Sequence, residues 1–154
     1  MQKAPLIDAL VAELRTRYDR LLAALEGSRE AATGADTKAE NKYDTRGLEA
    51  SYLAAGQADQ ADELLRALHA LESFEFRDFD IDDPVETGAL VEVEQDDELR
   101  YFLLAPAGGG VVLASDCGET VTVLGPGSPL AGKLLGTTTG TFLDDPGMVV
   151  LEVS

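Results

Sequence analysis

The sequence predicts an α+β protein in which an N-terminal antiparallel coiled-coil helical hairpin precedes a small antiparallel β domain with one short helix. Two observations carry this prediction. In the first half of the chain, apolar residues recur every three or four positions, which is the period of a helix. After Phe74 they alternate with polar residues or form short runs, which is typical of strands. We therefore divide the chain into residues 1–75 and 76–154.

The first predicted helix covers residues 5 to 32. Pro5 suits its first turn, and Thr33 with Gly34 ends the pattern, because glycine adopts a left-handed conformation at little cost. Its apolar residues are spaced alternately by four and three positions, as in the seam of a coiled coil. They are Ile7, Val11, Leu14, Tyr18, Leu21 and Leu25.

The second predicted helix begins near Asp36 to Asp44 and runs to about Ser73. Its apolar residues are smaller on average, which would let two helices approach closely. They are Leu48, Tyr52, Ala54, Ala58, Ala61, Leu65, Leu68 and Leu71. The charged segment between the helices, residues 34–46, is the expected tip of the hairpin.

The second half of the chain predicts five strands and one short helix. The strands are expected at Ala89–Glu94, Leu99–Leu104, Val111–Ala114, Thr120–Leu124 and Met148–Val153. Gln95-Asp96-Asp97 separates the first two as a hairpin turn. The short helix has Ser128 as its N-cap, Pro129 as its first residue and Gly136 as its stop signal. Three phenylalanines in the acidic joint, residues 74–84, are expected to pack it against the sheet.

Charge and composition exclude several classes of function. The net charge is −17, divided into −5 over residues 1–75 (14 acids, 9 bases) and −12 over residues 76–154 (15 acids, 3 bases). Such a surface disfavours direct binding of duplex DNA, because phosphates require a basic surface. No apolar run is long enough to span a membrane, no signal peptide is visible, and the single Cys117 fits a reducing compartment. We therefore expect a cytoplasmic protein without a membrane contact, and we expect Cys117 to be a buried, inert thiol.

Two motifs, taken in order, resemble the GreA/GreB family of bacterial transcription elongation factors. The first is the tip, with Asp36, Lys38, Glu40-Asn41 and Tyr43. The second is the helix Ser128-Pro129-Leu130-Ala131-Gly132-Lys133-Leu134-Leu135-Gly136, preceded by the strand Val121-Thr122-Val123-Leu124. The resemblance covers nearly the whole chain.

The resemblance implies an FKBP-like β domain that docks on RNA polymerase at the rim of its secondary channel, with the hairpin reaching toward the active site. The residues it places in docking are Ser128, Pro129, Leu130, Leu134 and Leu135. It implies indirect contact with the nascent RNA inside the channel. In cleavage-competent members, two tip acids help to hold a second Mg²⁺, and the polymerase then hydrolyses the end of a backtracked transcript. The resemblance thus implies no intrinsic cofactor, only Mg²⁺ shared with the polymerase.

The tip departs from the family pattern at its second acid. Aligned without a gap on Asp36 and Tyr43, the family's second acid falls on Ala39, and Lys42 replaces another acid. Glu40-Asn41 restores the expected pair only if one residue is inserted. The resemblance therefore gives Asp36 and Glu40 as the residues that assist catalysis and bind the metal, while Lys38, Asn41 and Tyr43 shape the tip.

Simpler interpretations stand beside this one. Asp36 and Glu40 also suit a solvated turn, Asp78 to Asp83 suit an acidic linker, and His69 suits helix packing or a surface position. The arginines of the hairpin suit either RNA steering or ordinary helix surface charge. Because the sequence offers no Ser/His/Asp or Cys/His set, we expect no free-standing enzyme. The alternatives to a cleavage factor are a channel-binding regulator without cleavage activity and, in a different class, a chaperone-like or structural coiled-coil protein.

Overall fold

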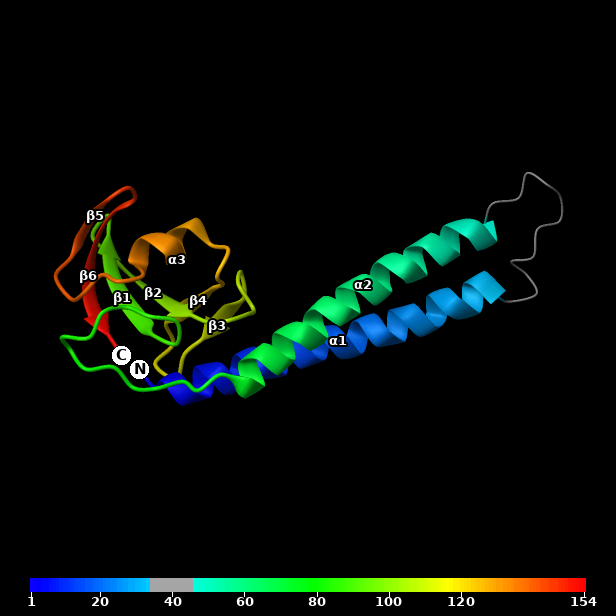
Figure 1. Cartoon of the computed structure of the whole chain (residues 1–154), viewed down its shortest axis with the longest axis horizontal. Coiled ribbons are helices and arrows are strands. Elements are labelled where there is room, and N and C mark those ends of the chain that lie inside the picture. Colours follow the sequence, from blue (N-terminus) through cyan, green and yellow to red (C-terminus); the bar gives the residue numbers. More distant parts are fainter. Residues whose placement is uncertain (34–45) are drawn as a thin grey trace. The chain divides into compact units, whose positions relative to one another are not determined.

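The computed structural model describes residues 1–33 and 46–154 (Figure 1). Two long helices come first in the chain, and a six-stranded sheet with one short helix follows, so the α+β class is confirmed. The chain forms two compact units, one built from Met1–Ala12 together with His69–Ser154 and the other from Glu13–Leu68. The division into residues 1–75 and 76–154 stays a prediction about domain organisation.

The two long helices have nearly the predicted bounds. Helix α1 spans Lys3–Thr33 and helix α2 spans Arg46–Ser73. Within the unit Glu13–Leu68 they run side by side in opposite directions, and both line one groove (Figure 1). Neither helix, in the part of the chain that the structure describes, is long and apolar enough to cross a membrane.

Burial along the helices departs from the single predicted seam. Leu14, Ala61, Leu68 and Leu71 are buried as the seam requires, but Ile7, Val11, Tyr18, Leu21 and Leu25 are only half-buried, and Leu65 is exposed. Leu48, Tyr52 and Ala54 lie outside the residues whose side chains are described. Coiled-coil packing of the hairpin therefore stays a prediction.

The most buried residues at the start of α1 are Leu6 and Leu10, which the heptad does not include. For Leu10 this burial has a physical cause in the neighbouring β structure. The side chain of Leu10 packs against Gly108, where an added Cβ would lie only 2.9 Å from Leu10 Cδ1. A heptad pattern reports contacts with one partner helix. It therefore does not identify Leu10, which packs on a loop of the β structure.

The sheet contains six strands in the order β3-β4-β2-β1-β6-β5. Their bounds are β1 Leu90–Gln95, β2 Glu98–Leu104, β3 Val112–Ala114, β4 Thr120–Leu124, β5 Phe142–Asp144 and β6 Gly147–Val153. All five predicted strands are present, and the hairpin turn between β1 and β2 has positive φ at Asp96 (56°) and Asp97 (61°). Strand β5 was not predicted, because three residues show no period.

The prediction of a wholly antiparallel sheet is wrong at one strand pairing. Strand β4 pairs in parallel with β2, with Tyr101 opposite Val121 and Leu104 opposite Leu124. After β2 the chain first forms the edge strand β3. It then turns back as β4, which lies between β3 and β2. A connection of this length permits a parallel neighbour, whereas a tight hairpin does not. The FKBP-like fold that the resemblance implies stays a prediction.

Helix α3, Pro129–Leu134, covers one face of the sheet (Figure 1). Its Ala131 and Leu134 join a buried cluster with alternate residues of the strands. The strand members are Val91, Val93, Phe102, Leu104, Leu124, Met148, Val150 and Val153. Alternation of side chains along a strand leaves the intervening residues on the opposite face, where the candidate site described below lies.

The joint between α2 and the sheet is tied down by aromatic rings and ion pairs. Phe79 packs against the buried cluster, as predicted, and the Arg77 guanidinium lies 3.9 Å from the centre of its ring. Arg77 also bonds Asp83 at 2.8 Å and Glu86 at 3.2 Å. The Phe74 and Phe76 rings meet edge to face at 4.8 Å. The acidic run is therefore partly neutralised by one arginine.

Cys117 lies in the turn between β3 and β4 and is exposed, so the expectation of a buried thiol is wrong. Its Sγ lies 3.2 Å from Ser115 Oγ. The residue belongs to a tight turn, Ser115 to Glu119, which is closed by backbone hydrogen bonds. Cysteine is usually buried, but turn geometry places this one at the surface.

Candidate functional site

The predicted tip residues lie outside the described residues. These are Asp36, Lys38, Glu40, Asn41 and Tyr43. Within residues 1–33 and 46–154, no group of three or more histidine, cysteine or acidic side chains is arranged to hold a metal ion. The aspartates of the acidic joint form no such group, and one of them, Asp83, instead accepts bonds from Arg77 and from the backbone N–H of Asp80. The hydrogen bond from Arg77 is the main cause that lowers the pKa of Asp83.

The five predicted docking residues on and around α3 divide into structural and accessible positions. Ser128 is the N-cap, with Oγ accepting from the Ala131 N–H at 3.3 Å, and Gly136 follows the helix with φ +81°, as predicted. Leu134 is fully buried and Leu130 is half-buried against the same cluster. Pro129 is exposed and Leu135 is 46% exposed. Of the five, these two therefore present the surface that a partner could reach.

The hairpin carries a groove between α1 and α2 of about 470 Å³. Its lining combines two leucines, two arginines, a glutamate and a glutamine: Arg17, Arg20, Leu21, Gln60, Glu63 and Leu64. Arg17 is paired with Glu13 one helical turn away, at 2.8 Å. That pairing reduces the cationic character that RNA steering would need.

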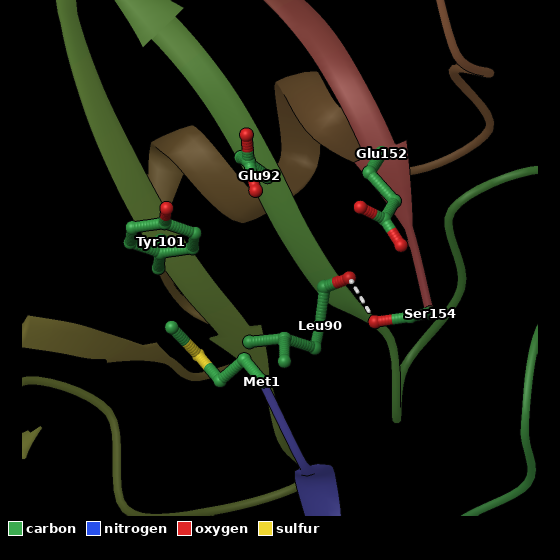
Figure 2. Close-up of a pocket in the computed structure, with 6 residues that line it drawn as sticks. All are labelled: Met1, Leu90, Glu92, Tyr101, Glu152 and Ser154. Carbon is green, nitrogen blue, oxygen red and sulfur yellow. Dashed lines mark hydrogen bonds between the residues drawn. The ribbon is translucent and has the colours of Figure 1, made fainter. Parts of the chain in front are cut away.

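A second hollow, of about 50 Å³, lies on the sheet face opposite α3 (Figure 2). It is lined by Met1, Leu90, Glu92, Tyr101, Glu152 and Ser154. Figure 2 shows the Tyr101 ring and the carboxylates of Glu92 and Glu152 around it. Register explains the grouping: Glu92 of β1 is directly opposite Tyr101 of β2 on one side and Glu152 of β6 on the other.

The electrostatics of this hollow are negative. Loss of solvent around the Tyr101 hydroxyl, followed by the nearby charges of Glu92 and Glu119, raises the pKa of Tyr101 above its usual value. Glu92 and Glu152 are like charges placed directly opposite each other, an arrangement that destabilises a sheet. No basic side chain forms an ion pair with either one in the part of the chain that the structure describes.

Sequence reasoning did not find this hollow. The alternation in Leu90-Val91-Glu92-Val93-Glu94 shows that the two glutamates share a face, and that signal was available. The pairing of β1 with β6 joins residues about sixty positions apart, and no local pattern encodes it.

Comparisons with known proteins complete the description. No protein-family model matches the chain, and no curated protein matches it. The chain is similar to the crystal structure of GreA factor homolog 1 (Gfh1) protein of Thermus thermophilus, with 18% sequence identity and a TM-score of 0.35, covering 94% of each chain.

Proposed function

We propose that this protein is a Gre-type transcription elongation factor that binds bacterial RNA polymerase at the secondary channel. Residues 76–154 dock on the polymerase, and residues 34–46 are presented to the channel. The observation that carries the proposal is the motif Ser128 to Gly136, which follows the hairpin and the strand β4 at the separation the resemblance requires. Its Ser128 cap and its stop at Gly136 are local features on which the motif depends.

The proposed chemistry belongs to the polymerase. Asp36 and Glu40 would supply carboxylate oxygens to a Mg²⁺ ion shared with the polymerase active site. Such oxygens suit this ion, which needs only one or two protein carboxylates when phosphates and water supply the rest. When bound, a second metal ion stabilises the attacking and leaving oxygens of phosphodiester hydrolysis. The protein itself is then a binding factor rather than an enzyme.

Transcript cleavage in stalled elongation complexes tests this function. The purified protein is added with Mg²⁺ to backtracked complexes carrying end-labelled RNA. We expect the RNA to shorten, and we expect Asp36→Ala to abolish shortening while polymerase affinity stays within about twofold, because docking resides elsewhere. Intact RNA under conditions where binding is verified would exclude the cleavage function.

A regulator without cleavage activity is the second candidate, and Ala39 at the position of the second acid favours it. In that case the wild-type protein binds polymerase and alters pausing or initiation without shortening the RNA. Glu40→Ala separates the two candidates, because only a cleavage factor that uses Glu40 loses activity in this variant. Failure to bind polymerase in any of these assays would instead favour a chaperone-like or structural coiled-coil protein.

A further inference from the structure

Two exposed apolar side chains, Phe142 and Leu99, lie on the sheet face opposite α3. Phe142 of β5 is opposite Val149 of β6, Val149 is opposite Glu94 of β1, and Glu94 is opposite Leu99 of β2. Directly opposed residues share a face, so these four side chains form one row across four strands. Phe142 is 61% exposed and Leu99 is 52% exposed. Phe142 and Leu99 stand at the two ends of this row, with Val149 and Glu94 between them.

The next row on the same face is acidic and hollowed. It contains Glu152, Glu92 and Tyr101 around the hollow of about 50 Å³ (Figure 2). A buried water needs only about 10–15 Å³, so the end of a longer side chain can enter. We call the surface formed by these two rows the acidic sheet face; it comprises Glu92, Glu94, Leu99, Tyr101, Phe142, Val149 and Glu152.

The charges of this face select the occupant. It carries three glutamates and no basic residue, in a half of the chain whose net charge is −12. A second copy of the chain, with net charge −17, would be repelled. A positive charge brought close to Glu92 and Glu152 would relieve their mutual repulsion.

We propose that the acidic sheet face is the docking surface for a basic segment of a partner protein, which inserts one lysine or arginine side chain into the hollow beside Tyr101. Glu92 and Glu152 pair with its charge, and the Tyr101 ring offers an aromatic face to the same cation. An apolar residue of the partner, next to the inserted one, packs on Leu99, which lies two positions from Tyr101 on β2. The combination resembles an interface anchor, in which one desolvated charged residue is surrounded by apolar contacts.

This inference rests on the proposed function, because the partner used to test it is RNA polymerase. It places a docking contact on the sheet face opposite α3, in addition to the accessible residues Pro129 and Leu135 at the α3 motif. The two surfaces can therefore be separated by mutation.

Affinity for bacterial RNA polymerase tests the inference in the full-length protein. Glu92→Gln with Glu152→Gln is the informative variant, because removing a like-charge pair leaves the fold at least as stable. We expect the dissociation constant to rise at least tenfold, and the salt dependence of binding to weaken. Glu75→Gln with Asp82→Asn, which removes the same charge from the joint, is the matched control and should bind as the wild type does.

The outcomes are distinguishable. Wild-type affinity in the Glu92/Glu152 variant, together with loss of binding in a Pro129/Leu135 variant, would overturn the inference and leave the proposed function intact. No binding by the wild-type protein would overturn both. Equal losses in the test and control variants would show that net charge alone acts, and would also overturn the specific site. If the wild type is a dimer in sedimentation equilibrium and the Glu92/Glu152 variant is a monomer, the face binds a second copy of the chain instead.

Discussion

At the scale of single residues, the glycines of the loop before β3 have a structural explanation. The backbone of Gly109 crosses that of Gly125, and a Cβ on Gly109 would lie 2.8 Å from the Gly125 nitrogen. Neither backbone can yield as a flexible side chain would. The close crossing of two loops therefore requires a glycine at position 109, whereas Gly108 and Gly110 have positive φ values of 82° and 88°.

Gly109→Ala should lower the free energy of unfolding by about 1–3 kcal/mol, which is the usual cost of forcing extra volume into a packed site. Gly127→Ala is the matched control, because nothing lies within 4 Å of an added Cβ and its φ lies outside the left-handed region. The control should be neutral or stabilising by up to about 1 kcal/mol, through the lower entropy of the unfolded chain. Urea unfolding of both variants measures the difference in stability. Equal stabilities would contradict the close contact between the backbones of Gly109 and Gly125.

Tyr101 predicts a pH dependence of stability at alkaline pH. Loss of solvation and nearby carboxylates raise the pKa of Tyr101 in the folded state above the ordinary value of 10.0. The folded protein thus holds the phenolic proton more tightly than the unfolded chain does. The stability contribution is fully present below pH 10 and is lost as pH rises through the folded-state pKa.

Urea unfolding at a series of pH values from about 8 to about 11 tests this expectation, because that range includes the ordinary tyrosine pKa. The wild type should lose stability more steeply above about pH 10 than Tyr101→Phe does. Parallel curves for the two proteins would show that the Tyr101 proton is not linked to folding.

At the scale of elements, α3 illustrates how one short helix divides its residues between the core and the surface. Leu134 and Leu135 are neighbours of the same type, yet Leu134 is fully buried in the cluster under α3 and Leu135 is nearly half exposed. The Ser128 cap and the left-handed Gly136 fix which of the two points inward.

Leu134→Ala should cost about 2–5 kcal/mol of unfolding free energy, because it leaves a cavity in a close-packed core. Leu135→Ala should change stability by no more than about 0.5 kcal/mol, as exposed substitutions usually do. Thermal or urea unfolding of the pair measures the contrast. A large loss for Leu135→Ala would mean that this side chain is covered in solution.

At the scale of the whole molecule, the compact unit that contains the sheet also contains the start of α1. Met1–Ala12 and His69–Ser154 belong together, with Leu10 packed on Gly108 and Met1 beside Leu90 at the hollow. The chain returns from α2 to the place where α1 began. Residues 1–12 and 69–75 therefore belong to the same compact unit as the sheet.

A fragment of residues 76–154 should unfold at lower urea concentration than the sheet of the full-length protein. It lacks Leu6 and Leu10, which are fully buried in the complete chain. Burying such a side chain contributes about 1.5–3 kcal/mol. Tyr101 is the only tyrosine of the fragment, so its fluorescence reports unfolding directly. An unchanged midpoint would show that the sheet folds without the start of α1.

Much of the fold follows from local signals. The spacing of Leu14, Tyr18 and Leu21 is helical, and the alternation around Val91 and Val93 is that of a strand with one buried face. The Ser128 cap and the Asp96-Asp97 turn were readable because each depends on a few adjacent residues. Strand β5 and the burial of Leu10 were not, since strand β5 is too short to show a period and the burial of Leu10 depends on the distant loop at Gly108.

The sequence by itself determined the class of the protein, the two periods and the motif at Ser128 to Gly136, because helix and strand periodicity and helix caps are local properties. Only the tertiary structure decided which strands are neighbours, that β4 runs parallel to β2, and that Glu92, Tyr101 and Glu152 surround one hollow. Those facts depend on contacts between residues far apart in the chain. Hydrogen bonding between strands, the packing of α1 on a glycine loop and the cover of α3 set them.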